Sequence, residues 1–167
     1  MTTLDMYRIT DRLDDDTLAA LVARLPSRGK HPRFAEMMSD YFSAMQVHSA
    51  KRVLDLGCGT GVATRAIAGA PGFSGHVTGI DVSPYLTAEA QRLAAQEGLG
   101  DKVEFRVGDS QQLALPEQSF DVAVAHTLVS HVPDPLSVLK ELRRVVRPGG
   151  FIGVFDGDYA SLTGTCQ

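Results

Sequence analysis

The sequence lacks the features typical of secreted, membrane-spanning and metal-binding proteins. It has two cysteines, Cys58 and Cys166, which are too few for a disulfide framework and are not spaced as metal ligands. No apolar run reaches the roughly 18 residues that a membrane-spanning helix needs. The first ten residues also lack the basic and then apolar pattern of a secretory signal. We therefore expect a cytoplasmic protein without an integral membrane segment and without a bound metal.

An excess of basic residues is also missing. The chain has 16 Lys and Arg against 20 Asp and Glu, a net charge of −4. No strong positive field is available to hold a phosphate backbone, so we do not expect nucleic acid as a partner. The 167 residues are 44% hydrophobic and 22% charged, as in ordinary globular domains, and domains average about 150 residues. One folded unit is the expectation.

The first fifty residues read as helices. Asp14 to Asp16 with Thr17 begin a capped helix that we expect to end at Pro26, with a loop after it. A second helical stretch runs from Phe34 to about Val47, with apolar residues three and four positions apart. We divide the chain into an N-terminal helical cap, residues 1–50, and a core, residues 51–167.

The core alternates between strand and helix patterns. Five short apolar runs read as strands: RVLDL at 52–56, HVTGI at 76–80, VEFRV at 103–107, FDVAVA at 120–125 and FIGVF at 151–155. Helical or turn-like stretches separate them. Parallel strands joined by right-handed crossovers satisfy this order most simply. The predicted fold class is therefore α/β, an open doubly wound and mostly parallel sheet.

A glycine-rich turn lies between the first strand and its helix. Gly57, Gly59 and Gly61 follow the strand in VLDLGCGTG, and glycines at such a turn let a ligand touch the backbone. Because position 62 is Val, the spacing is G-x-G-x-G and not the G-x-G-x-x-G of dinucleotide-binding proteins. The turn indicates a nucleotide-like ligand, and the alternative is a tight strand-to-helix connection with no ligand.

Three carboxylates come at or just after the ends of successive strands. Asp55, Asp81 and Asp109 occupy the edge at which open α/β sheets bind ligands. An acid after the second strand suits a ribose diol, because a carboxylate accepts two hydroxyl hydrogen bonds. Asp55 is a poor neighbour for a pyrophosphate, so a cationic, phosphate-free nucleoside such as S-adenosylmethionine fits better. Taken singly, each Asp also reads as a helix cap or turn residue.

Four stretches together resemble the class I S-adenosylmethionine-dependent methyltransferases, in particular the ubiquinone and menaquinone biosynthesis group. They are VLDLGCGTG, GIDVSP, GDSQQLALPEQSFDVAVAHTLVSHV and LRRVVRPGGFIGVFD, and they span residues 51–156. The resemblance implies a Rossmann-like sheet of order 3-2-1-4-5. It also implies S-adenosylmethionine as cofactor, S-adenosylhomocysteine as its product, and methyl transfer to a small-molecule acceptor.

The resemblance implies a set of cofactor-binding residues, which are Asp55, Gly57, Cys58, Gly59, Gly61, Asp81, Val82, Asp109, Ser110, Ala125 and His126. The glycine turn with its cysteine would line the methionine part. Asp81 would hold the ribose, and Asp55 would act on the ammonium directly or through water. Val82 would pack on adenine, and Asp109 with Ser110 would address the adenine edge. Ala125 or His126 would face the methionyl group.

The candidates for acting on the methyl acceptor are His126, His131, Asp156, Asp158 and Tyr159. Methyl transfer is an in-line displacement, so a base is needed only if the acceptor must lose a proton. A packing or capping role is the alternative for His131, which precedes VPDP. The fourth strand ends in AHTL, without the Asp-Pro-Pro-Tyr type signature of amino-group methyltransferases, which argues against nucleic-acid methylation.

The N-terminal helices offer a further set of residues, Tyr7, Arg8, Arg33 and Phe34. In this fold such helices commonly close over the cofactor, so these side chains are expected either to reach the pocket or simply to pack.

The end of the chain differs from the family pattern. Members continue after the fifth strand with a helix and an antiparallel strand pair, for which the last residues are too few. The fifth strand, 151–155, is then an apolar edge, and we expect it to pair with another copy or to be covered by the chain's own terminal residues.

Two other functions stay open. One is cofactor binding as a fragment or partner-dependent subunit without turnover. The other is an NAD-dependent oxidoreductase, which the glycine spacing and Asp55 disfavour.

Overall fold

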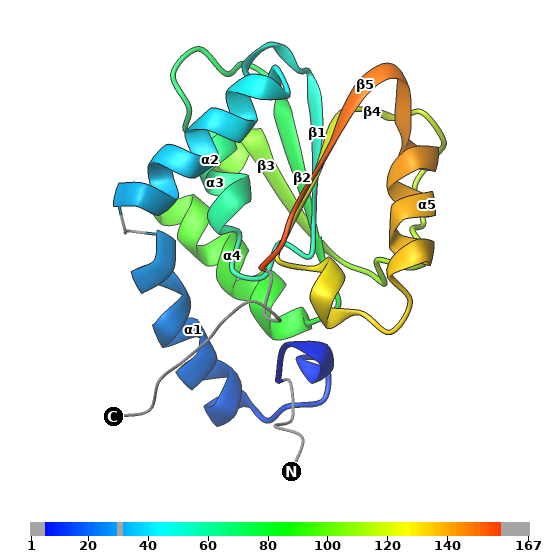
Figure 1. Cartoon of the computed structure of the whole chain (residues 1–167). Helices are drawn as coiled ribbons and strands as arrows, with labels where there is room; N and C mark the ends of the chain where they lie inside the picture. The colour runs from blue at the N-terminus through cyan, green and yellow to red at the C-terminus, as the bar shows by residue number, and fades with distance from the viewer. Residues whose placement is uncertain (1–5, 30–31, 158–167) are drawn as a thin grey trace, which may run out of the picture.

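The computed structural model describes residues 6–29 and 32–157 (Figure 1). Short 3-10 turns and two helices precede the sheet: η1 (Met6–Ile9), α1 (Asp15–Gly29), α2 (Pro32–Ala44) and η2 (Val47–Ser49). The core consists of β1 (Arg52–Leu56), α3 (Val62–Ala68), β2 (His76–Asp81), α4 (Pro84–Gln96), η3 (Gly100–Lys102), β3 (Val103–Val107), β4 (Phe120–His126), η4 (Val129–His131), α5 (Pro135–Val145) and β5 (Val146–Phe155). No helix in this part of the chain is long and apolar enough to cross a membrane.

The strands form one parallel sheet in the order β3-β2-β1-β4-β5. The predicted fold class and strand order are confirmed. Figure 1 shows α5 on one side of the sheet and α2, α3 and α4 on the other. Since side chains alternate along a strand, β1 directs Val53 to one face and Leu54 to the other. Because all strands are parallel, the carboxyl ends of β1, β2 and β4 meet at one edge of the sheet.

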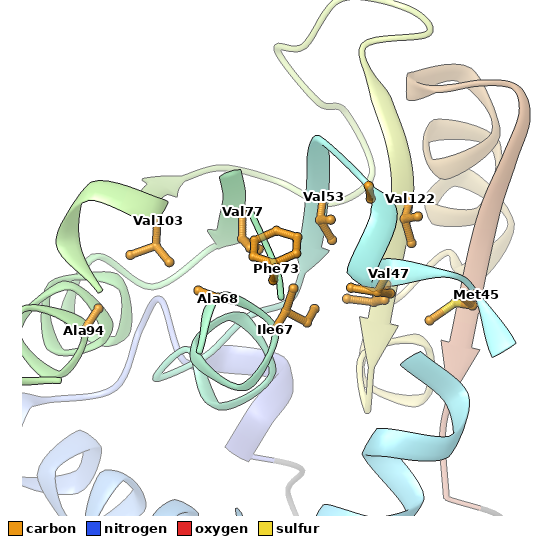
Figure 2. Close-up of a cluster of buried hydrophobic side chains, with 12 residues drawn as sticks. Met45, Val47, Val53, Ile67, Ala68, Phe73, Val77, Ala94, Val103 and Val122 are labelled. Carbon is orange, nitrogen blue, oxygen red and sulfur yellow. The ribbon is translucent and has the colours of Figure 1, made fainter. Parts of the chain in front are cut away.

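The two faces have separate cores. On the α3 face, Val53, Val77 and Val122 pack with Ile67 of α3 and Val47 of η2 (Figure 2). On the α5 face, the cluster is built around Leu54, Leu56, Val138, Leu142 and Val145. Because β1 is buried on both faces and pairs with β2 and β4, the loop that follows it begins in the interior of the sheet.

Several boundaries differ from the sequence-based expectation. The first helix is capped by Asp14, which accepts from the Thr17 amide at 2.9 Å, but it continues past Pro26 to Gly29. The second helix ends at Ala44, and Gln46 then adopts a left-handed conformation with φ 55°.

The last strand begins earlier than predicted. Val146 already pairs with Phe120, and an irregularity precedes the pairing of Phe151 with Val122. Gly150 permits this path, because a Cβ there would clash with the Asp121 carbonyl oxygen. Within the described residues, β4 is the only strand that pairs with β5.

Candidate functional site

The glycine turn after β1 is tied to β2 and open toward solvent. The amides of Gly57 and Cys58 both donate to the Ile80 carbonyl oxygen, at 2.8 and 3.0 Å. Gly57 and Gly59 have φ values of +73° and +53°, which disfavour any residue with a Cβ. A Cβ at Gly59 would meet nothing within 4 Å. The turn thus leaves an empty cradle in which a ligand can approach the backbone.

Gly61 has a packing role that the sequence did not indicate. A Cβ at Gly61 would lie 2.8 Å from the Phe105 ring and 3.2 Å from the Ala90 methyl. Gly61 also does not line the two cavities described next. Its missing side chain makes room for packing between α3, α4 and β3, while its neighbours Thr60 and Val62 line the inner cavity.

Two adjoining cavities occupy the carboxyl edge of the strands. The inner cavity has a volume of about 160 Å³ and reaches Asp55, Gly59 and His126. The outer cavity has a volume of about 240 Å³ and reaches Val82, Asp109 and Ser110. Six residues line both: Tyr7, Thr10, Gly57, Asp81, Leu128 and His131. The structure therefore brings most of the predicted site residues around one continuous space.

Asp55 is the most deeply buried acid of the site, at 1% exposure. Its Oδ2 accepts a hydrogen bond from Thr64 Oγ1 at 2.6 Å, while its Oδ1 is buried without a partner among the described residues. Burial, reinforced by the nearby charge of Asp81, raises the pKa of Asp55 to about 6. An unpaired buried carboxylate oxygen is costly, so this atom is suited to receive a cationic or donor group.

Asp81 closes β2 and holds the glycine turn in place. Its Oδ2 accepts from the Gly59 amide at 2.8 Å and its Oδ1 from the Ser83 amide at 2.9 Å. Burial raises the pKa of this carboxyl group, although the backbone donors oppose the shift. Each carboxylate oxygen has a second lone pair, so Asp81 can accept two further hydroxyl donors.

The inner cavity is electrostatically selective. Its walls carry Asp55 and Asp81, and no Lys or Arg is among the described residues that line it. Cys58 also lines it, and burial together with the two carboxylates raises the pKa of its thiol, which stays protonated. Such a cavity attracts a cation and repels a phosphate.

The outer cavity combines an apolar wall with a polar rim. Val82 is 42% exposed, an unusual state for a valine, and it faces this space. Asp109 Oδ1 accepts from the Gln111 amide at 2.8 Å, so this residue does stabilise a turn, as the alternative interpretation held. Asp109 and Ser110 both still line the cavity. A partly apolar group with polar edges suits this space.

The end of β4 brings His126 into the inner cavity. Tyr41 Oη lies 3.1 Å from His126 Nδ1, and His126 Nε2 is buried without a partner among the described residues. Burial lowers the pKa of His126, which keeps the imidazole neutral near pH 7. The preceding residue, Ala125, is 1% exposed in the core and does not line either cavity.

The other candidates for acting on an acceptor are dispersed. His131 lines both cavities, and its ring centroid lies 5.2 Å from that of Tyr7. Asp156 accepts from the amide and hydroxyl of Ser130 at 2.8 and 2.7 Å, and it does not line these cavities. Asp158 and Tyr159 lie outside the described residues, as does Cys166.

Two of the four N-terminal candidates reach the site. Tyr7 of η1 lines both cavities, and Phe34 of α2 meets His126 edge to face at 5.1 Å. Arg33 instead lines a separate surface hollow on α2, and the side chain of Arg8 lies outside the described residues. The segment around η1 thus lines one side of the inner cavity.

Sequence reasoning missed three polar residues of the site. Thr60, with a buried hydroxyl that has no partner among the described residues, lies inside the glycine turn, and that position was a usable signal. Thr10 is buried in both cavity walls, and Tyr41 reaches His126 from α2. Neither has a local signal, because each meets the site only through tertiary packing. Within residues 6–29 and 32–157, no cluster of His, Cys, Asp and Glu is arranged to hold a metal.

Comparisons with known proteins agree with this geometry. A family model described as a methyltransferase domain matches residues 54–154. The demethylmenaquinone methyltransferase of Geobacillus kaustophilus is 32% identical over 152 residues, which cover 91% of this chain and 64% of that protein. The sterol 24-C-methyltransferase ERG6B of Gibberella zeae is 40% identical over 105 residues, which cover 63% of this chain and 27% of that protein.

A solved structure matches the fold and points to a wider range of chemistry. The crystal structure of the cyclase SpnF aligns with a TM-score of 0.69 and 29% identity, covering 75% of this chain and 47% of that one. Among these comparisons, the chain spans 27% of the sterol methyltransferase and 64% of the demethylmenaquinone methyltransferase. The fold is thus shared by proteins whose names give different reactions.

Proposed function

Because the chain belongs to the methyltransferase domain family, we propose that it binds S-adenosylmethionine in the inner and outer cavities and methylates a small-molecule acceptor. One observation carries the proposal. Two carboxylates, Asp55 and Asp81, stand at the ends of adjacent strands around a glycine cradle, and one buried oxygen of Asp55 has no partner among the described residues. Donor groups of positive charge satisfy this arrangement.

The residues present fit this cofactor part by part. Asp55 Oδ1 would take the ammonium group, and Asp81 would accept the two ribose hydroxyls with its remaining lone pairs. Val82 would pack on the adenine, and Ser110 with Asp109 would lie at its polar edge. The cofactor supplies an electrophilic methyl group on a sulfonium.

The chain's own contribution is to orient and to exclude water. The glycine turn fixes one side of the inner cavity through two amides on Ile80 and one on Asp81. Tyr7 and Thr10 cover the other side from the N-terminal segment, and we propose that residues 1–50 act as the cap of the site. Alignment of the reacting atoms is the main source of acceleration in a displacement of this kind.

The proposed acceptor is small and largely apolar. The relatives are named for a sterol and for demethylmenaquinone, both of which are ring-containing apolar molecules. The described lining of the inner cavity includes Phe34, Met38 and Leu86 beside its polar groups. An apolar ring system fits this wall.

A second function, cofactor binding without turnover by this chain alone, is favoured by the state of the sheet edge. β5 ends beside His126, and within the described residues its outer edge has no partner strand. A partner that covers β5 would then complete the wall on the acceptor side. An NAD-dependent oxidoreductase is disfavoured, because a pyrophosphate would meet Asp55 and Asp81 in the inner cavity.

Calorimetry tests the cofactor and a transfer assay tests the reaction. We expect S-adenosylhomocysteine to bind and NAD to give no heat. Incubation with tritiated S-adenosylmethionine and an apolar metabolite extract should then label a small molecule. Binding without labelling would favour the second function, and binding of NAD in place of S-adenosylhomocysteine would refute the proposal.

A further inference from the structure

His126 contacts three aromatic rings. Its ring stacks on Phe155 of β5 at 4.9 Å and 18°, and on Tyr41 of α2 at 6.0 Å and 21°. Phe34 meets it edge-on at 5.1 Å. The hydrogen bond with Tyr41 directs Nδ1 toward the tyrosine hydroxyl, Nε2 is buried, and the residue lines the inner cavity.

The backbone beside His126 is fixed as well. The next residue, Thr127, has a φ of 54°, a conformation that residues with a Cβ rarely adopt. Its amide donates to the Phe155 carbonyl oxygen at 2.7 Å, which ties the ends of β4 and β5 together. The strained residue ends β4 directly after the imidazole that lines the cavity.

The direction of the Tyr41–His126 hydrogen bond follows from the basicity of the two atoms. Burial and the charge of Asp55 hold the pKa of Tyr41 above its usual range, so its hydroxyl keeps its proton. An unprotonated imidazole nitrogen is a stronger acceptor than a phenolic oxygen. The tyrosine therefore donates to Nδ1, and the ring proton resides on Nε2.

We infer that Tyr41 is a positioning residue that fixes His126 in the tautomer with a protonated Nε2, which presents a hydrogen-bond donor to the methyl acceptor. The buried Nε2 has no hydrogen-bond partner among the described residues, and a bound acceptor would supply that partner. A neutral imidazole of this tautomer has no free lone pair at Nε2. His126 is then a donor to the acceptor and not its general base.

This inference rests on the proposed function and narrows its acceptor. A donor N–H at the end of β4 recognises an oxygen that accepts hydrogen bonds, such as a carbonyl, enolate or phenolate oxygen at or next to the nucleophilic atom. Because Nε2 already carries a proton, His126 cannot deprotonate the acceptor at this atom. An acceptor that arrives as an anion does not require such a step. The acceptor class is therefore an apolar ring molecule with such an oxygen.

Nitrogen NMR of the whole chain without ligand tests the tautomer. With ¹⁵N-labelled histidine, and with the His126 signals assigned by their loss in His126→Asn, we expect Nδ1 in the unprotonated range and Nε2 in the protonated range. Tyr41→Phe should move both signals toward each other, because the two tautomers then mix. The matched control Tyr85→Phe, on α4 and outside both cavities, should leave them unchanged.

A spectrum with the proton on Nδ1, or one that Tyr41→Phe does not alter, would overturn the inference. This readout does not need the cofactor, so failure to bind S-adenosylhomocysteine would count against the proposed function alone. If Tyr41→Phe does not fold, the wild-type spectrum still decides the tautomer.

A pair of probes tests the acceptor class. In protein saturated with S-adenosylhomocysteine, acetophenone should shift the Nε2 resonance of His126. Ethylbenzene, which has a similar shape without the oxygen, should not. Equal shifts from both probes, or none from either, would refute the recognition of an acceptor oxygen at Nε2.

Discussion

The two halves of the sheet on either side of β1 prepare the site by different means. On the β2 side, Asp81 fixes the ligand edge through hydrogen bonds from the backbone amides of Gly59 and Ser83. On the β4 side, His126 is fixed by the rings of Tyr41, Phe34 and Phe155. Backbone geometry is local and recurs wherever the same turn occurs, whereas ring packing depends on distant segments. The first half therefore suits a constant cofactor and the second a variable acceptor.

The sharpest test of this contrast is the loss of Asp81. Asp81→Ala removes the acceptor of the Gly59 amide and leaves donor groups unpaired, at a cost of about 1 to 3 kcal/mol each. We expect the affinity for S-adenosylhomocysteine, measured by calorimetry, to fall by roughly ten- to a thousandfold. His126→Asn, on the other half, should leave it within a few fold.

Asp109→Ala serves as the matched control on the β2 side, because this exposed residue mainly stabilises its own turn. It should weaken binding less than Asp81→Ala. Unchanged affinity in a folded Asp81→Ala variant would show that Asp81 does not bind the cofactor. It would also refute the proposed difference between the two halves.

The glycine turn itself can be split into a packing part and a ligand part. Gly61→Ala combines a positive φ with a contact of 2.8 Å to the Phe105 ring, so we expect a loss of stability of about 2 to 4 kcal/mol. Gly59→Ala has the same backbone strain but open space for its methyl group, and its loss should be about 1 to 2 kcal/mol. Urea unfolding of both variants measures the difference. Equal losses would show that Gly61 has no special packing role.

The sequence predicted the first half of the site better than the second. The strands, the glycine turn and Asp81 have local patterns, and the structure places them at one edge as expected. Tyr41, by contrast, lies 85 residues from His126 and sits in a helical stripe that reads as ordinary core. Contacts between such segments are set by packing, so no spacing in the sequence reports them. Gly61 shows the converse. It lies within a recognisable glycine motif, yet the absence of its side chain also makes room for packing against Phe105 and Ala90.

The buried charge of Asp55 predicts a pH dependence on the cofactor side. Its pKa is about 6 in the folded chain and about 3.9 when unfolded, so between these values the folded state binds more protons. Stability must then fall as pH rises from about 4 to about 6, because the folded state disfavours the charged form. Over this pH range, we expect the free energy of unfolding of Asp55→Asn to fall by about 1 to 3 kcal/mol less than that of the wild type.

Urea unfolding of the wild type and Asp55→Asn at pH 4, 5, 6 and 7 measures the difference. S-adenosylhomocysteine should reverse the trend, since its ammonium favours the charged carboxylate. Parallel stability curves for the two proteins would show that Asp55 titrates normally and is not the acceptor of a cation.

The smallest expected change in stability concerns the outer edges of the two halves. β3 carries Glu104 and Arg106, which pair at 2.9 Å, and such charges protect an edge strand from association. β5 has no charge from Phe151 to Phe155, and its Phe151, Ile152 and Val154 are exposed. We expect the chain to pair its β5 with that of another copy, so that light scattering reports a dimer or larger species.

Val154 is 44% exposed, and Val154→Lys should change the free energy of unfolding by only about 0.5 kcal/mol or less, the usual range for surface positions. A lysine there gives β5 the protection that β3 already has, so the variant should be monomeric with unchanged affinity for S-adenosylhomocysteine. Arg106→Lys, on the protected edge, should leave the association of the wild type intact. Hydrogen exchange adds a second readout, because pairing slows the outward amides of β5 only in the associated form. A wild-type monomer with fast exchange along β5 would show that an apolar edge of this length is tolerated without a partner, and the two edges would then differ in sequence but not in behaviour.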